Sequence, residues 1–298
     1  MANYLDLFFG ILIGIAAYVL LYIGKGIQKY SIEGLKADKT VKSKNSGIWI
    51  FGTVLTASFM FVHWIPLTIF DIPANLIAPL EGLGLITLLI FSYKVLKEPI
   101  NKKEIIGAIL IIIGTVVINL QATEASEPSL SQFNSTTFWV SMAIIFGVEG
   151  ILVLISKMND WKFAGVAIGF TAGTFMAFQT LSKRLSDIDE LSLIFTFVTF
   201  ATATLTLVIT QIAFSKAKAN QVVPCFTSAS ISFTAIVGYL GLSETIKELQ
   251  IIGIAIIVIG VIVLSAFQQT VPEVVDDVND REVQQIAETE EEVGETVE

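Results

Sequence analysis

The chain has 298 residues, of which 54% are hydrophobic and only 15% are charged. Soluble globular proteins carry about 25% charged residues, so the composition excludes an ordinary soluble domain and indicates an integral membrane protein. The formal net charge of −9 misleads, because residues 271–298 hold eleven acidic residues and one arginine. The rest of the chain has a net charge of +1 and offers no basic patch for binding nucleic acid.

Nine segments are long and apolar enough to be transmembrane helices, which need about 20 mostly apolar residues. They cover residues 4–24, 48–70, 73–95, 104–121, 136–156, 162–183, 190–214, 219–242 and 249–268. The sequence therefore predicts an all-α integral membrane protein with nine transmembrane helices. Residues 269–298 follow as an acidic, disordered tail, because Pro272 blocks helix continuation and few apolar side chains come after it.

One motif occurs twice in the chain. Residues 74–79 and 219–224 both read Ala-Asn-x-aliphatic-x-Pro, and each copy opens a long apolar segment. A glutamate ends each segment and a helix with two glycines in matching register follows, giving Glu98, Gly107 and Gly114 in the first copy and Glu244, Gly253 and Gly260 in the second. In an apolar chain this repetition is typical of transporters built from two structural repeats. We interpret the glycine pairs, seven residues apart, as packing seams.

The basic residues predict how the chain crosses the membrane. Most of them fall in alternate links between the predicted helices: Lys25, Lys29, Lys36, Lys39, Lys42 and Lys44; Lys94, Lys97, Lys102 and Lys103; Lys157 and Lys162; Lys216 and Lys218. Basic links stay in the cytoplasm, so we expect a multi-pass protein of the cell membrane with its N-terminus outside and its C-terminal tail in the cytoplasm. The other links carry only Lys183, Arg184 and Lys247.

With this topology the two motif copies run in opposite directions, which predicts an inverted repeat. Residues 1–121 form a first half of four helices, and residues 136–268 form a second half of five helices. Residues 122–135 form an extracytoplasmic link between the halves, and residues 269–298 form the tail.

The run Pro-Ala-x-Leu-Ile-x-Pro-Leu at residues 73–80 resembles the signature of the NIPA-type magnesium transporters. The similarity continues through residues 96–98, Gly107 and Gly114, and it returns in the second half at Gln211, residues 216–219, residues 222–224 and Glu244. These transporters belong to the drug/metabolite transporter superfamily, with EamA-like carriers as wider relatives. The resemblance implies a bundle of the drug/metabolite-transporter type and carrier-type transport.

Two glutamates lie inside predicted helices. Glu81 stands between Pro79 and Gly82, roughly 12 Å below the outer membrane surface, and Glu149 lies roughly 20 Å below that surface. An ionisable group at the centre of a transmembrane helix costs about 2.5–3.5 kcal/mol and faces the bundle or water. We therefore expect Glu81 and Glu149 to bind the substrate or a metal ion, whereas a purely packing role is the alternative.

Weaker candidates for the binding site are polar residues of the same helices. His63 is the chain's only histidine and lies roughly 10 Å from the outer surface, although a packing role is equally compatible with it. Asn75, Thr227 and Ser228 offer further oxygen or nitrogen atoms, or hydrogen bonds between helices. Pro79 and Pro224 each free a backbone carbonyl one turn earlier, which near a cavity can coordinate a cation.

The leading function is a secondary carrier or facilitator for Mg²⁺ or another divalent cation. A proton-coupled exporter of a small organic metabolite or drug is the alternative, and a non-transporting scaffold is a third reading. The expected partners are the lipid bilayer and the small solute or divalent cation, with a homodimer left open. No nucleotide-binding loop or catalytic triad spacing occurs, so we expect neither an enzyme nor a cofactor.

Overall fold

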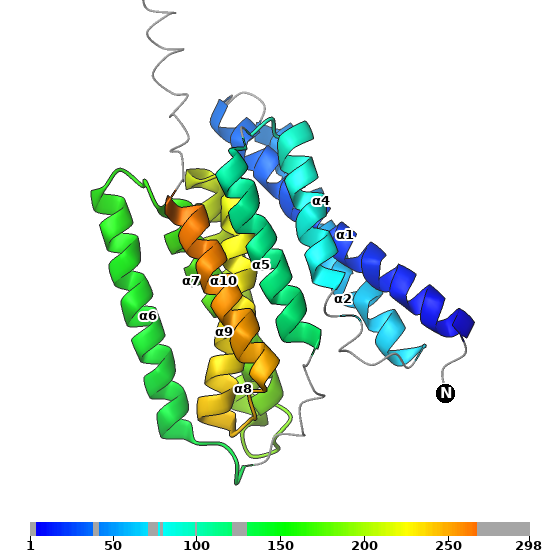
Figure 1. Cartoon of the computed structure of the whole chain (residues 1–298), viewed down its shortest axis with the longest axis vertical. Coiled ribbons are helices and arrows are strands. Elements are labelled where there is room, and N and C mark those ends of the chain that lie inside the picture. Colours follow the sequence, from blue (N-terminus) through cyan, green and yellow to red (C-terminus); the bar gives the residue numbers. More distant parts are fainter. Residues whose placement is uncertain are drawn as a thin grey trace, which may run out of the picture.

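The structure, a computed structural model, describes residues 4–37, 42–70, 77, 80–98, 100–120 and 130–266. These residues form nine α-helices and no strands (Figure 1). The helices are α1 (Tyr4–Ala37), α2 (Lys42–Thr68), α4 (Glu81–Lys94), α5 (Lys102–Leu120), α6 (Ser135–Met158), α7 (Ala164–Leu185), α8 (Ser192–Lys216), α9 (Ala219–Leu242) and α10 (Glu248–Ala266). Six of them, α1, α2, α6, α7, α8 and α9, are long and apolar enough to cross a membrane. The chain is thus a multi-pass membrane protein, as its composition predicts.

The first helix is longer than the sequence predicts. It was expected to end near residue 24, but α1 continues to Ala37. The expectation that Lys25 and Lys29 belong to a cytoplasmic link is therefore wrong, because both lie inside α1 and are buried, with 7% and 3% of their surface exposed. Their ammonium groups find partners within the bundle, so the helix need not end where the charges begin.

The third predicted helix is shorter than expected. Instead of residues 73–95, the helix α4 begins at Glu81 and has 14 residues. Pro79 precedes it in the sequence and has no backbone N–H to donate, which favours a helix that starts after this proline. Residues 71–76, 78 and 79 lie outside the described residues, and so do the predicted site residues Asn75 and Pro79. The same holds for most of the link between the halves and for the whole acidic tail.

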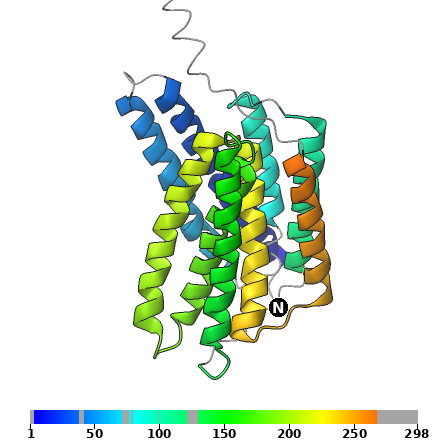
Figure 2. The same cartoon turned by 90° about the vertical axis from the view of Figure 1, so that its left-hand side faces the viewer.

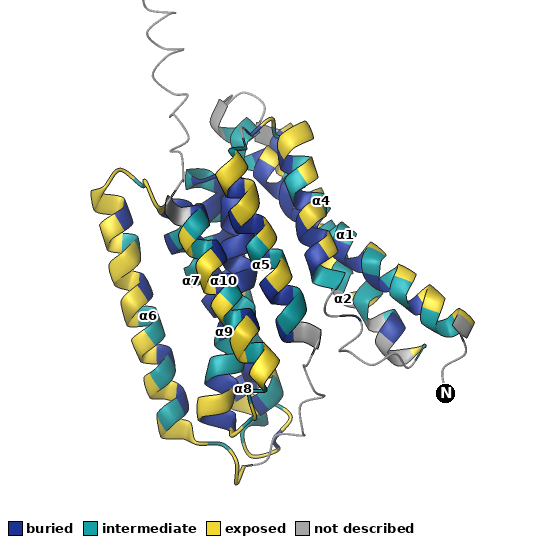
Figure 3. Cartoon of the chain, in the orientation of Figure 1, coloured by how far each residue is buried: buried dark blue, intermediate teal, exposed yellow. Residues whose placement is uncertain are grey.

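Helix α9 lies in the interior of the bundle. Its first eleven residues, 219–229, are all buried, and it packs against α7, α6, α5 and α4. The main apolar cluster joins Val222 and Val223 of α9 to Tyr22 of α1 and Leu88 of α4. By contrast, α6 stands at one edge with a mostly exposed surface (Figure 3), as expected for a helix that faces lipid.

Two helix pairs make the most extensive backbone contacts. Figures 1 and 2 place α1 beside α2 and α5 beside α10. In the second pair, a Cβ atom added to Gly107 would lie 2.9 Å from the carbonyl oxygen of Gly260, and one added to Gly114 would lie 2.7 Å from that of Gly253. The prediction that these four glycines are packing seams is confirmed, and each seam joins one half of the chain to the other.

The glycine seam predicts a large difference between two otherwise similar substitutions. Gly107→Leu forces a side chain into the backbone of α10, so we expect a loss of about 1–3 kcal/mol of stability from overpacking. Gly147 of α6 has nothing within 4 Å of the added Cβ, so Gly147→Leu should leave the unfolding midpoint unchanged. Thermal unfolding of both variants in one detergent compares them. Equal midpoints would contradict the close contact of α5 and α10.

Candidate functional site

Glu81, the first residue of α4, faces α1 and α9. Its Oε1 accepts a hydrogen bond of 2.9 Å from the Tyr22 hydroxyl of α1. The oxygen of that hydroxyl lies 2.9 Å from Oγ1 of Thr227 in α9. Since Tyr22 donates its proton to Glu81, the Thr227 hydroxyl donates to Tyr22. The structure thus connects two of the predicted site residues, Glu81 and Thr227, through a tyrosine that the sequence analysis missed.

The ring of Tyr22 packs directly against a glycine of α4. A Cβ atom on Gly84 would overlap the ring carbons of Tyr22, so a larger residue at position 84 would displace the tyrosine. Tyr22 is completely buried and Glu81 is half-buried. The hydroxyl between Glu81 and Thr227 therefore has a fixed position, which is a requirement for a binding site of defined geometry.

Lys25 brings a positive charge into the same region. It lies one turn after Tyr22 on α1, with its Nζ 3.7 Å from the ring centroid of Phe226 and 5.4 Å from that of Tyr22. The Tyr22 side chain connects it to Glu81, which accepts the hydrogen bond of the tyrosine hydroxyl, but no carboxylate of the described residues comes within 4.0 Å of its Nζ. Aromatic ring faces therefore hold this ammonium group.

His63 of α2 lies in an aromatic cluster next to this group. Its ring centroid is 4.9 Å from that of Phe59 and 5.5 Å from that of Tyr18. Tyr18 precedes Tyr22 by one turn on α1, so the cluster adjoins the site along that helix. The contacts described for His63 are ring contacts, which agree with the packing alternative.

Glu149 lies elsewhere. Only 3% of its surface is exposed, its Oε1 accepts a hydrogen bond from Thr174 of α7, and its Oε2 is buried with no hydrogen-bond partner in the described part of the chain. Helix α6, which carries Glu149, packs against α7 and α9, and in Figure 1 it stands at the opposite edge from α4, with α5 and α10 between them. The structure therefore does not bring Glu149 to Glu81. Among the described residues there is also no group of three or more His, Cys, Asp or Glu that could hold a metal ion.

The first turns of α9 contain a hydroxyl group that is hydrogen-bonded within the helix and a side-chain amide that has no hydrogen-bond partner among the described residues. The Ser228 hydroxyl donates a 2.6 Å hydrogen bond to the Pro224 carbonyl one turn earlier, so Ser228 is engaged within its own helix. Pro224 has no N–H, which deprives the Asn220 carbonyl of its helical donor. Both polar side-chain atoms of Asn220 are also buried without a partner in the described residues. The carbonyl predicted to be freed by Pro224 thus lies beside an unsatisfied side chain.

Glu98 of the first repeat caps the helix that opens the second. Its carboxylate accepts hydrogen bonds from the N–H of Ala219 at 2.9 and 3.1 Å, from the N–H of Asn220 at 3.5 Å, and from the Ser92 hydroxyl. Burial raises the pKa of Glu98 above its ordinary value, while nearby Lys29 and these hydrogen bonds act in the opposite direction. A carboxylate at a helix N-terminus is favoured because the unpaired N–H groups there carry partial positive charge.

Lys29 caps the C-terminal end of α8, the helix that precedes α9. Its ammonium donates hydrogen bonds of 2.8 Å to the carbonyls of Phe214 and Ala217 at the end of α8. It also lies 2.9 Å from Glu33 and 3.9 Å from Glu98. We call Lys29, Glu98 and the helix ends that they bind the Lys29–Glu98 network.

Glu104 strengthens the same end of the bundle. Its Oε1 accepts a 2.9 Å hydrogen bond from the Gln221 side chain and lies 3.8 Å from the Lys218 ammonium. Its Oε2 accepts from the N–H of Asn101, as in a capping box at the start of α5. Glu104 of α5 thus meets Lys218, the residue before α9, directly beside the Lys29–Glu98 network.

Glu244, the counterpart of Glu98 in the sequence repeat, has a different partner. It pairs with Arg184 at the end of α7, and the two side chains are 23% and 20% exposed. Burial raises the pKa of Glu244 and the Arg184 guanidinium opposes this shift. The pair joins α7 to the link after α9, at the end of the bundle opposite to the Lys29–Glu98 network.

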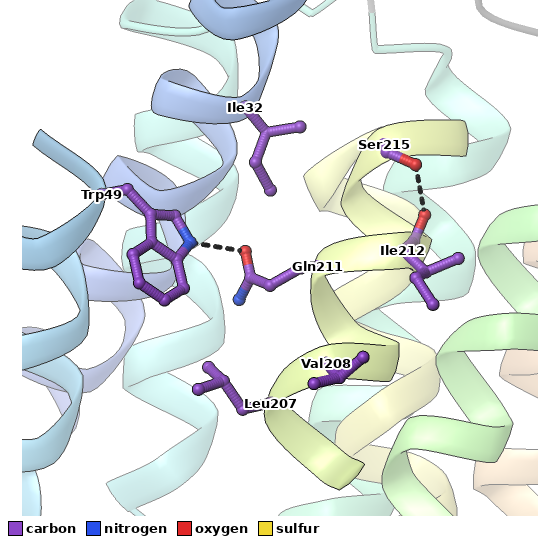
Figure 4. A pocket seen from close by; sticks show the side chains of 7 residues that line it. All are labelled: Ile32, Trp49, Leu207, Val208, Gln211, Ile212 and Ser215. Carbon is purple, nitrogen blue, oxygen red and sulfur yellow. Dashed lines mark hydrogen bonds between the residues drawn. The ribbon is translucent and has the colours of Figure 1, made fainter. Parts of the chain in front are cut away.

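An apolar groove of about 380 Å³ opens between α1, α2 and α8. Ile32, Trp49, Leu207, Val208, Gln211, Ile212 and Ser215 line it (Figure 4). Trp49 donates a 3.0 Å hydrogen bond to Gln211, which donates in turn to Gln28 at 3.3 Å. The lining contains no charged residue, so this groove does not suit a cation.

The family model described as magnesium transporter NIPA matches residues 5–162 of the chain. This range contains Tyr22, Lys25, Glu81 and Glu98. Searches found no match to the chain among curated proteins or among solved structures.

The Lys29–Glu98 network predicts that its members determine stability. Glu98→Ala leaves the Lys29 ammonium and the first N–H groups of α9 without their carboxylate, so we expect a loss of about 3–5 kcal/mol, as when one partner of a buried ion pair is removed. Glu190→Ala removes an exposed glutamate and should change little. Chemical unfolding in detergent micelles measures both. A Glu98→Ala protein as stable as the control would contradict the capping role.

Proposed function

Because the chain belongs to the NIPA magnesium transporter family, we propose that it carries Mg²⁺ across the membrane through the site formed by Glu81, Tyr22 and Thr227. The observation that carries this proposal is the chain of hydrogen-bonded oxygen atoms that runs from the half-buried Glu81 to the buried Tyr22 and Thr227. Mg²⁺ prefers oxygen ligands, keeps several of its waters and is commonly bound through one or two carboxylates. One glutamate with two neighbouring hydroxyl groups meets that need.

The glycine seams support an inverted repeat of nine transmembrane helices. In the sequence repeat Gly107 corresponds to Gly253, and Gly114 to Gly260. Exchanging each glycine for its counterpart turns the contact of Gly107 with Gly260 into that of Gly253 with Gly114, which is the other contact observed. A two-fold axis in the membrane plane produces this reciprocity, and carriers with such repeats expose a central site to each side in turn.

We further propose that the Lys29–Glu98 end of the bundle faces the cytoplasm. With Lys25 and Lys29 inside the bundle, Lys36, Lys39, Lys42 and Lys44 still stand between α1 and α2 or at the adjoining helix ends. Lys94, Lys97, Lys102 and Lys103 do the same for α4 and α5, so these remain the two most basic connections. Basic links remain in the cytoplasm, which places the N-terminus outside and the acidic tail inside.

A proton-coupled exporter of an organic solute is the second candidate, and two observations favour it. Lys25 gives the site a positive as well as a negative charge, a combination that suits an organic zwitterion. Glu149 has an unpartnered buried oxygen, as a carboxyl group that binds a proton in the membrane would have. This reading assigns the coupling to Glu149 rather than to Glu81.

Glu81→Gln should abolish Mg²⁺ flux while the protein still folds. Glutamine keeps an oxygen that can accept the hydrogen bond from Tyr22, but it lacks the charge that attracts the ion. The measurement is Mg²⁺ uptake into proteoliposomes that contain an indicator dye. Glu149→Gln is the matched control, because it removes another intramembrane glutamate that does not meet Glu81, and it should retain Mg²⁺ flux.

The same pair of variants separates the two candidates. Flux of Mg²⁺ at the wild-type rate in Glu81→Gln would contradict the assignment of this site. Solute transport that is driven by a pH gradient and is lost in Glu149→Gln would favour the exporter.

The orientation gives a separate prediction. A reporter that is active only in the cytoplasm should be active when fused after Glu298, because the tail follows a helix that ends on the basic side. The same reporter fused before Met1 should be inactive. The reverse pattern would overturn the orientation and, with it, the antiparallel arrangement of the two motif copies.

A further inference from the structure

We propose that Lys25 is a tethered counter-cation of the transport site: its ammonium balances Glu81 when the site holds no ion, and an entering cation displaces it. This inference rests on the proposed function. Lys25 is not among the residues that the sequence analysis assigned to the site.

The first argument is the balance of charge. The Lys25 ammonium lies 5.4 Å from the ring centroid of Tyr22, and the hydroxyl of the same tyrosine donates a 2.9 Å hydrogen bond to Glu81, so the two opposite charges lie on either end of one side chain. A single charge inside a bundle is costly, and a nearby opposite charge offsets part of that cost. An empty site with Lys25 and Glu81 is close to neutral.

The second argument is that Lys25 is held in a way that permits movement. Its Nζ lies over the Phe226 ring at 3.7 Å, without a carboxylate within 4.0 Å in the described part of the chain. Lysine has a flexible four-carbon stem and a compact charge. The ammonium can therefore move relative to Glu81 without breaking a salt bridge.

Lys29, one turn further along α1, shows the contrasting arrangement. It is equally buried, but two carbonyl hydrogen bonds of 2.8 Å and two carboxylates hold its ammonium. Lys29 is thus fixed as part of the helix caps, whereas Lys25 is placed beside the site and held by rings. The two residues form a natural pair of test and control.

The third argument concerns the valence of the transported ion. The repulsion between a fixed positive charge and a bound cation grows in proportion to the charge of the cation. Lys25 therefore weakens the binding of a divalent ion twice as much, in free energy, as that of a monovalent ion. Such weakening suits a carrier, which must release its ion as well as bind it.

The test is the Mg²⁺ dependence of uptake into proteoliposomes. Lys25→Met keeps the length of the side chain and removes the charge, so we expect the KM for Mg²⁺ to fall by about tenfold or more. Inhibition by a monovalent cation should strengthen by only about the square root of that factor, roughly threefold, because the interaction scales with charge. Lys25→Arg should keep the wild-type KM. Lys29→Met should lower thermal stability and leave the KM unchanged.

Phe226→Leu provides an independent variant should Lys25→Met fail to fold. Without the ring, the ammonium loses its cation–π contact and is drawn towards Glu81, so the KM for Mg²⁺ should rise. An unchanged KM in Lys25→Met or in Phe226→Leu would overturn the proposal. A raised KM in Lys25→Met would also overturn it, since Lys25 would then help to bind the substrate.

These results also separate the two proposals. Wild-type protein that moves no divalent cation refutes the proposed function, and the role of Lys25 with it. Wild-type Mg²⁺ flux combined with an unchanged KM in Lys25→Met refutes only the role of Lys25.

Discussion

The position of α9 depends on two buried charges at the break between α8 and α9. The Lys29 ammonium binds the last carbonyls of α8, and the Glu98 carboxylate binds the first N–H groups of α9. Each charge has the sign that the helix end favours. Since α1 supplies the lysine and the link after α4 supplies the glutamate, one contact fixes α9 against both helices. Thr227, two turns into α9, can therefore meet Tyr22 of α1 and Glu81 of α4, and the candidate site follows from this cap.

The fold could be predicted from the sequence where the apolar pattern decides it. Every predicted segment overlaps one of the nine described helices, because long apolar runs leave few alternatives in a membrane. The residues at which the helices begin and end were less predictable. The basic residues of α1 suggested a loop, but Lys25 and Lys29 have partners in the interior, and such partners come from segments distant in the chain. The start of α4 moved to Glu81 for a local reason, the preceding proline, that the length criterion ignores.

The candidate site was predicted in part. Glu81 and Thr227 were found because a charge or hydroxyl group inside an apolar helix stands out. Tyr22 and Lys25 were missed, because they were assigned to the end of a helix and to a loop. A signal was nevertheless present: Tyr22, Lys25 and Lys29 are spaced by three and four residues, which places them on one helix face. A polar stripe of this kind on an otherwise apolar helix indicates a face that points into the bundle.

The two ends of the bundle differ in what it costs to open them. Among the described residues, the Lys29–Glu98 end is closed by ion pairs whose side chains are less than one-tenth exposed, and leaving one charge of such a pair buried without its partner costs about 3–5 kcal/mol. The opposite end is joined by Arg184 and Glu244, which are about one-fifth exposed. Solvent screens such a pair, so it stabilises this end by about 1 kcal/mol or less, as surface ion pairs do. A carrier with these two closures opens more readily at the Arg184 end. In the orientation and for the function that we propose, this end faces outward, so an ion from outside would reach Glu81 before the Lys29–Glu98 network has to separate.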